Sequence, residues 1–290
     1  SGFQQGFYQF TGTQHAISQE AAGGHAAELA FCTKCHTGEG FVSQQVNGNP
    51  PAVFEDPHGI TCSACHDPHD SPNYAQIRLT GAATISSGEV YEDPGRGGLC
   101  MRCHESRVSD AESTAVNSFR GAHHSTQTDM MLGLNAIEFG LEVIGNSAHT
   151  TIVEETCVRC HMAPPTEAGR GVTDPPLVGS HTFILRDDMG TPDDPSDDIV
   201  NAENGCSECH PGLSDTLDLE ARGDYDGDGQ LEGTQSEVRG LLALLRPGLL
   251  EIPGTSHEDD GTIGISEEDF ANMTEAQKKV RYNYKYVVDD

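Results

Sequence analysis

The chain has 290 residues and a formal net charge of −30, from 46 acidic and 16 basic side chains. A surface this acidic repels phosphate backbones and anionic lipid headgroups, so we expect no nucleic-acid partner. Only 35% of the residues are hydrophobic and none is Trp, which leaves few side chains for a conventional core of this size. No stretch approaches the roughly 20 apolar residues of a membrane-spanning helix, so we expect no membrane span.

The first third of the chain predicts little regular structure. Residues 19–31 can form a short helix, although Gly23 and Gly24 weaken it. Residues 37–57 predict a loop because Gly and Pro recur in them. Alternating stretches at 75–79 and 89–91 predict a small hairpin.

The last third differs in composition from the rest. Residues 187–198 are dense in Asp and predict a solvated loop, and residues 212–290 contain no cysteine. Within this last part, residues 234–237 have the Thr-x-x-Glu pattern of a capping box and precede an apolar run at 238–245, which predicts a helix.

One pentapeptide pattern, Cys-x-x-Cys-His, occurs five times and contains all ten cysteines. Two thiols three residues apart can add to the two vinyl groups of one haem, and the histidine that follows can reach the iron. A thioredoxin-like pair, a disulfide framework or half of a zinc site would explain one Cys-x-x-Cys, but not five adjacent histidines. The sequence therefore predicts five c-type haems. They attach through Cys32 and Cys35, Cys62 and Cys65, Cys100 and Cys103, Cys157 and Cys160, and Cys206 and Cys209, with His36, His66, His104, His161 and His210 as proximal iron ligands.

Five haems would supply much of the buried apolar surface that the side chains lack. We therefore expect a fold organised by its haems, mostly irregular coil with short α-helices and little β structure. We predict two parts: a pentahaem-binding region at 1–211, and a haem-free region at 212–290 with a calcium-like loop and helices.

Nine histidines lie outside the five motifs, and most are a few residues from one. In a chain with so few basic residues, this excess favours histidine as the sixth ligand of every iron. Met130, Met131 and Met162 are as easily explained by packing against porphyrin. His257 lies far from any motif, and we expect it to be an ordinary surface residue. The distal candidates are His15, His25, His58, His69, His123, His124, His149 and His181.

Iron with two histidine ligands has no open position for a substrate. Multihaem reductases need one such position, often marked by Lys in place of the motif histidine, and all five motifs here end in His. We therefore expect an electron carrier without catalytic residues. The alternative is a periplasmic reductase of the nitrite or hydroxylamine type with one open-coordination haem.

The run Cys65-His66-Asp67-Pro68-His69 predicts close spacing of two haems. Pro68 ends any helix and turns His69 away from the haem that His66 ligates, so a second haem must lie nearby. His58 and His149 precede motifs and can link neighbouring haems in the same way. We predict that the haems form one continuous chain.

Residues 224–230 resemble the start of an EF-hand loop, with carboxylates at positions 1, 3 and 5 and Gly at position 6. Position 12 departs from the pattern because it is Gln235, so Glu232 or Glu237 would have to complete the shell. Glu237 also belongs to the capping box, and an acidic turn without metal is the alternative. The calcium candidates are Asp224, Asp226, Asp228, Gln230 and Glu237.

The compartment follows from the predicted cofactor, because c-type haem is attached outside the cytoplasm. The chain begins without a basic and apolar leader, and we expect a mature, exported form. We predict an extracellular or cell-surface location, with the periplasm as the alternative.

Several runs resemble multihaem c-type cytochromes of metal-respiring and anaerobic bacteria and archaea, including the extracellular cytochrome nanowires that polymerise on the cell surface. The runs are at 35–42, 65–69, 146–150, 160–164, 179–183 and 282–284, together with the calcium-like loop.

This resemblance implies bis-histidine haems in alternating stacked and T-shaped pairs, with His69, His149 and His181 in positions that look like distal ligands. It also implies a homopolymer in which a histidine ligates a neighbour's haem. The stretch before Cys32 carries His15 and His25, and we expect one of them to be this link. A monomeric pentahaem carrier with all ligands in one chain is the alternative. Redox partner cytochromes or extracellular acceptors would complete the path.

Overall fold

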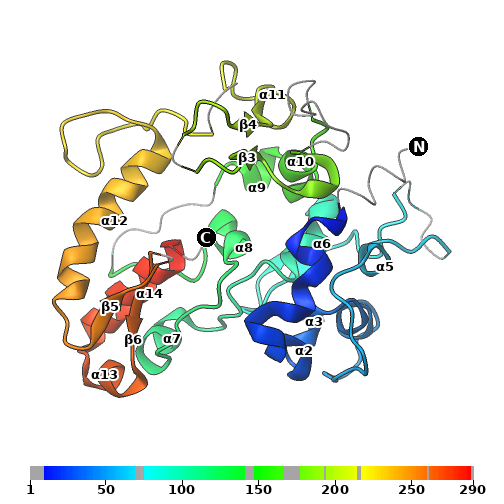
Figure 1. The fold of residues 1–290 in the computed structure, drawn as a ribbon, viewed down its shortest axis with the longest axis horizontal. Helices are drawn as coiled ribbons and strands as arrows, with labels where there is room; N and C mark the ends of the chain where they lie inside the picture. The colour runs from blue at the N-terminus through cyan, green and yellow to red at the C-terminus, as the bar shows by residue number, and fades with distance from the viewer. Residues whose placement is uncertain are drawn as a thin grey trace. The chain divides into compact units, whose positions relative to one another are not determined.

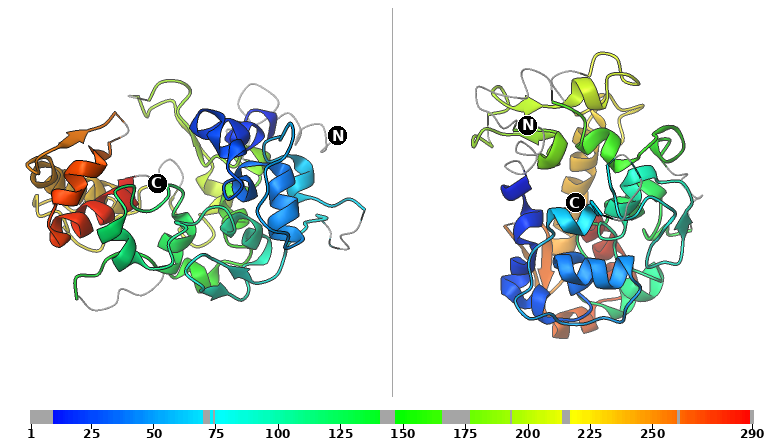
Figure 2. Two further views of the ribbon diagram at one scale, coloured as in Figure 1. Left: turned by 90° about the horizontal axis from the view of Figure 1, so that it is seen from below. Right: turned by 90° about the vertical axis from the view of Figure 1, so that its right-hand side faces the viewer.

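The computed structural model describes residues 10–69, 73, 75–140, 147–165, 177–192, 194–213, 217–259 and 261–288. The chain divides into two compact units. Unit 1 contains residues 1–83, 91–103 and 153–217, and unit 2 contains residues 84–90, 104–152 and 218–290. Figures 1 and 2 show short helices, long connecting segments and few strands, so the coarse class predicted from the sequence is confirmed.

The helices of unit 1 are single turns or little more. They are the 3₁₀-helices η1 (Gln14–Gly24), η3 (Gly95–Gly97) and η4 (Ser180–Thr182), the π-helix η2 (Phe41–Val46), and α2 (His25–Glu28), α3 (Thr33–His36), α4 (Gly38–Gly40), α5 (Cys62–Cys65), α6 (Gly98–Met101), α10 (Cys157–His161) and α11 (Ala202–Gly205).

The predicted helix at 19–31 begins earlier and breaks in the middle. Gly23 and Gly24 have φ of 66° and 91°, left-handed values that end η1 before α2 begins.

The predicted loop at 37–57 is wrong for residues 38–46, which form α4 and η2. The Thr37 hydroxyl accepts a hydrogen bond from the Gly40 N–H at 3.0 Å and so begins α4. A Cβ on Gly40 would lie 2.2 Å from the Thr33 carbonyl oxygen, so only glycine allows α4 to pack on α3. Phe41 follows and is buried, which fixes η2.

The predicted pairing of 75–79 with 89–91 is also wrong. Strand β1 (Ala83–Thr84) pairs with β2 (Val90–Tyr91), and Ala83 is fully buried. Ile77 instead forms an isolated antiparallel bridge with His66. A second small sheet joins β3 (Arg186–Asp187) to β4 (Ile199–Val200), and most of the described residues between these strands are exposed, as predicted for the acidic loop.

The apolar core of unit 1 is small. Among the described residues, its one cluster contains Phe41, Ile60 and Ala64, with partly buried side chains around them that include Cys65 and Cys103. At about 1.5–3 kcal/mol for each large buried side chain, such a cluster contributes little against the entropy of ordering so many loop residues.

Unit 2 has a conventional core. Its elements are α7 (Ala111–Asn117), α8 (Gln127–Leu132), α9 (His149–Ile152), α12 (Thr234–Leu250), β5 (Thr255–His257), β6 (Ile263–Ile265), α13 (Glu267–Asn272) and α14 (Glu275–Val288). Strands β5 and β6 are antiparallel, and Figure 1 shows them beside α12 and α14.

Helix α14 places aromatic side chains in two apolar clusters. Tyr282 and Tyr286 pack with Val108, Ala122 and Ile137, and Tyr284 packs with α12 and α13. The buried hydroxyls find carbonyl acceptors, for example Tyr282 on Asn135 O at 2.9 Å, so burial costs no hydrogen bond.

These contacts bear on the predicted division of the chain. Residues 218–290 do not stand apart from the rest but share unit 2 with residues 84–90 and 104–152, because α14 packs on the segment after the third motif. Along the chain, the units change between Leu217 and Asp218 and also between Cys103 and His104. Within the described part of the chain, no helix has the length and apolar character needed to cross a bilayer.

Candidate haem-attachment sites

The five Cys-x-x-Cys-His motifs are wound into tight turns. In the first, second and fifth motifs, the histidine N–H donates to the carbonyl of the first cysteine, at 3.1, 2.8 and 2.9 Å. Helix α10 covers the whole fourth motif, and in the third the Cys103 N–H donates to Cys100 O at 3.1 Å. Positions three apart on such a turn lie on one side, and all ten cysteines are free of disulfides. Each motif thus offers two thiols and an imidazole, the donor set that one c-type haem requires.

Hydrogen bonds from Nδ1 orient the rings of four motif histidines. An acceptor oxygen at Nδ1 means that this atom carries the proton, so Nε2 keeps the lone pair that binds a metal. The pairs are His36 with Ser18 O (3.2 Å), His66 with Ala75 O (2.6 Å), His104 with Gln127 Oε1 (3.2 Å) and His161 with Phe183 O (3.0 Å).

The first and third motifs contact each other through reciprocal hydrogen bonds. The Cys35 thiol donates to Arg102 O at 3.7 Å, and the Cys103 thiol donates to Lys34 O at 3.9 Å. A hydrogen bond with Cys35 and burial raise the pKa of Cys103 well above its usual value. Cys65 packs in the same apolar cluster as Cys103, which brings the second motif to this place as well.

The third and fourth motifs meet just before their first cysteines. The Thr156 hydroxyl donates to Pro94 O at 2.9 Å, and Arg96 forms an ion pair with Glu155 at 3.0 Å. A hydrogen bond from the Cys100 thiol lowers the pKa of Cys157 to about 7, against the opposing effect of burial. The Cys157 thiol therefore ionises more readily than an ordinary cysteine.

The fourth and fifth motifs pack through α10 and α11, which Figure 1 shows near one another. Arg159 forms an ion pair with Glu208, and the Asn204 amide donates to Pro164 O at 2.8 Å. The pKa of Cys160 is raised by burial and by the nearby Cys206.

The first and second motifs are joined through Ser18. Its hydroxyl donates to His36 O at 2.9 Å and accepts from the Ile60 N–H at 3.1 Å. The motifs of unit 1 therefore form one connected group. The first motif contacts the second and the third, the second also packs beside the third, the third contacts the fourth, and the fourth contacts the fifth.

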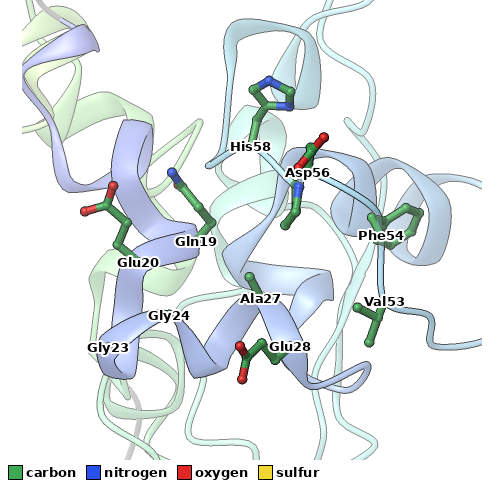
Figure 3. A pocket seen from close by; sticks show the side chains of 11 residues that line it. Gln19, Glu20, Gly23, Gly24, Ala27, Glu28, Val53, Phe54, Asp56 and His58 are labelled. Atoms are coloured by element: carbon green, nitrogen blue, oxygen red, sulfur yellow. The ribbon is translucent and has the colours of Figure 1, made fainter.

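A pocket of about 850 Å³ lies between η1, α2 and the segment at 53–58 (Figure 3). η1 and α2 supply Gln19, Glu20 and Glu28, and the segment at 53–58 supplies Phe54 and His58. The side-chain amide oxygen of Gln19, Oε1, is buried without a hydrogen-bond partner. The volume is within the range of about 300–1,000 Å³ that cofactor pockets have.

His58 is held by an acidic neighbour, since its Nδ1 lies 2.8 Å from Glu39 Oε1. Burial raises the pKa of Glu39, but hydrogen bonds from His58 outweigh it and hold the pKa below its usual value. With Nδ1 in this contact, Nε2 is the atom through which His58 could bind a metal.

The other distal candidates lie in varied surroundings. His25, His69, His124 and His149 are exposed, and His15, His123 and His181 are half-buried. The rings of His123 and His124 stack with centres 4.1 Å apart. His257 is exposed on β5, as predicted.

The ring centre of His181 lies 6.2 Å from that of the motif histidine His66. Burial and the nearby His66 lower the pKa of His181. His15 lies close by, with its ring centre 5.0 Å from that of Phe183.

The predicted calcium residues are brought together in two overlapping groups. Asp224, Asp226 and Glu237 form one, and Asp226, Asp228 and Glu232 form the other, each with oxygens within 4.8 Å. The side-chain amide of Gln230 donates to Asp228 at 3.1 Å. Exposed acidic groups often gather without an ion, so calcium stays a prediction.

Glu237 is not part of a capping box. It is buried, and its carboxylate accepts from the N–H groups of Tyr225, Asp226 and Glu232. Asp218 caps α12 instead, accepting from the N–H groups at 235 and 236 at 2.6 and 3.2 Å.

Sequence reasoning missed the groups that orient the motif histidines. Ser18, Ala75 and Phe183 act through backbone carbonyls, which no residue type marks, and Gln127 is one amide among many. Comparison of the chain with models of protein families, with curated proteins and with solved structures found no match.

Proposed function

We propose that the chain is an electron-transfer protein that holds five c-type haems, exported from the cell and working as the subunit of an extracellular conductive filament. The observation that carries this proposal is the series of contacts between motifs in unit 1. Thiols of the first and third motifs, and of the third and fourth, lie at hydrogen-bonding distance. Groups attached at such cysteines would adjoin edge to edge.

The donor set supports haem rather than another group. In four motif histidines, an acceptor at Nδ1 makes Nε2 the ring atom that can bind a metal. Each motif also presents its two thiols from one turn. The small core around these motifs also fits the proposal, because porphyrin faces would add the apolar surface that unit 1 lacks.

The chemistry that bound haem supplies is reversible one-electron transfer. The residues of the chain fix where it happens. Cysteine pairs would anchor each group, and the oxygen acceptors of His36, His66, His104 and His161 would orient these proximal rings. Electron transfer along this path would require no conformational change.

The test is production with export and c-type haem maturation, followed by intact-protein mass and a reduced spectrum with and without carbon monoxide. We expect a mass increase of five haems and almost no carbon monoxide binding. A matched variant, Cys206→Ala with Cys209→Ala, should lose one haem. Absence of covalent haem would overturn the proposal, and strong carbon monoxide binding by the native protein would favour a reductase.

A further inference from the structure

The segment that carries His181 is held firmly on both sides. Gly179 N–H donates to Ile184 O at 2.8 Å, and Ser180 N–H donates to Ala163 O at 3.2 Å. The Asn201 amide donates to the same Ala163 carbonyl at 3.0 Å. His181 is therefore presented from a defined backbone position on η4.

The backbone on either side of His181 is strained. Ser180 and Phe183 have φ of 51° and 61°, left-handed values that cost a non-glycine residue roughly 1 kcal/mol or more. Strain of this kind persists where the surrounding structure holds it, and it gathers at ligand-binding positions. Here it sets the direction of one imidazole.

The distance between the His66 and His181 rings matches the distance expected for two ligands on opposite sides of one metal atom. Their centres are 6.2 Å apart and their planes are inclined by 40°. Ring atoms lie about 1.1–1.2 Å from the centre of an imidazole, and a metal–nitrogen bond is about 2.0 Å, so two rings in line through a metal have centres about 6.3 Å apart.

Other arrangements would give other distances. Two histidines at the tetrahedral angle of a zinc site would have ring centres about 5.1 Å apart. Rings in direct stacking contact lie closer still, as His123 and His124 do at 4.1 Å. The 6.2 Å separation of the His66 and His181 ring centres is therefore closest to the value for two ligands in line through one metal atom.

We propose that His66 and His181 are the two axial ligands of the same iron, that of the haem attached at Cys62 and Cys65. This rests on the proposed function. The Nδ1 of His66 donates to Ala75 O, which leaves Nε2 for the metal. His181 lies between the fourth and fifth motifs in the sequence, so this bond would tie that segment to the second motif.

The same segment serves a second site. Phe183, two residues after His181, accepts through its carbonyl the Nδ1 hydrogen bond of the proximal His161 at 3.0 Å. In this proposal, the His181 side chain ligates the haem of the second motif, and the Phe183 carbonyl orients the histidine of the fourth motif. The two haems would be coupled through one short piece of backbone.

The experiment uses the haem-loaded protein. In His181→Ala, one haem of the five should become high-spin in the ferric state and bind carbon monoxide in the ferrous state. In His181→Met, one haem should stay low-spin, gain the charge-transfer band of histidine–methionine ligation and shift to a higher potential. His257→Ala, at an exposed position, is the matched control and should change neither.

The assignment to the second motif is tested by combining His181→Ala with Cys62→Ala and Cys65→Ala. If His181 ligates that haem, the combined variant has four haems and loses the carbon monoxide binding of the single variant. Carbon monoxide binding that survives would overturn the pairing, as would a His181→Met protein with unchanged spectra. Absence of covalent haem in the native chain would instead refute the proposed function.

Discussion

At Gly179 the backbone has φ of 70° and ψ of −176°, a combination that only glycine adopts readily. The space is closed as well, because a Cβ would lie 2.3 Å from Ala163 O and 2.5 Å from the Asn201 amide nitrogen. Both the backbone conformation and the close packing therefore require glycine at position 179, just before the strained turn of His181.

We predict that Gly179→Ala destabilises the protein by about 2–4 kcal/mol, since it combines a forbidden backbone region with overpacking. Urea unfolding of native and variant protein measures the difference. Gly190→Ala is the control, because Gly190 also has a left-handed φ of 79° but meets nothing within 4 Å, so its cost should be near 1 kcal/mol. Equal costs for the two variants would contradict the packing argument.

Glu155 is a second residue whose role can be measured. The Arg96 N–H and Nε donate to Glu155 Oε2 at 2.6 and 3.0 Å, and these contacts hold the pKa of Glu155 below its usual 4.5 despite partial burial. A folded pKa below the unfolded one means that Glu155 stabilises the fold above the unfolded value, and that this contribution is lost as pH falls through the folded pKa.

We expect Glu155→Gln to lower stability at pH 7 by less than about 1 kcal/mol, because both side chains of the pair are partly exposed, and to have a smaller effect at an acidic pH below the usual pKa of Glu. Unfolding in urea at the two pH values measures this. Glu154→Gln, at the exposed neighbouring position, should lack the pH dependence. A Glu155→Gln effect that is the same at both pH values would refute the role of the charge.

The residue scale also shows what the sequence can predict. The Cys-x-x-Cys-His turns were evident because attachment needs fixed residue types at fixed spacing. The oxygens that orient the rings of His36, His66 and His161 were not, because they belong to backbone carbonyls brought near by the fold. The partner that we propose for His66, His181, was one of eight candidates in the sequence, and its proximity to His66 is visible only in the folded chain.

At the scale of elements, helices were predicted better than strands. The apolar run after residue 237 does form α12, but its start is set by Asp218, which is distant in sequence. The hairpin prediction failed because residues 76–78 bond to backbone groups of the second motif instead of to residues 89–91. Period-two patterns of four or five residues cannot distinguish these partners.

The acidic loop before α12 gives the prediction at this scale. If calcium binds Asp224, Asp226 and Glu237, chelation should raise hydrogen exchange over residues 220–245 and leave haem spectra unchanged, since no motif lies in that segment. Hydrogen exchange with calcium or with a chelator is the measurement. Asp226→Asn should abolish the calcium effect, while Asp188→Asn in the other acidic loop should keep it. Identical hydrogen exchange with and without calcium would show that this loop does not bind the ion.

At the scale of the whole molecule, the two units differ in how they are stabilised. Unit 2 has two apolar clusters of six buried residues each, whereas the cluster around the motifs in unit 1 has three. We therefore expect unit 1 to depend on its bound groups and unit 2 to depend on its side chains. The hydrophobic fraction of the whole sequence averages over the two units, so composition alone could not show this difference between them.

The proposed filament needs a histidine that is free to reach a neighbour, and the structure distinguishes the two candidates. His15 is half-buried, with its ring 5.0 Å from Phe183 and 6.4 Å from the buried Phe10. His15 is therefore packed against aromatic side chains of its own chain. His25 has a side chain 72% exposed, and its Nδ1 lies 3.0 Å from Glu28 Oε2, which leaves Nε2 directed away from that partner.

We predict that His25, not His15, supplies the ligand to the next subunit. His25→Ala should then give monomers in which one haem is five-coordinate and high-spin, because assembly and ligation are one event. His15→Ala should still assemble. Negative-stain microscopy and size-exclusion chromatography of haem-loaded protein, at raised ionic strength to screen the charge of −30, measure assembly. Native protein that stays monomeric at high concentration with all five haems low-spin would instead support a monomeric carrier with every ligand in one chain.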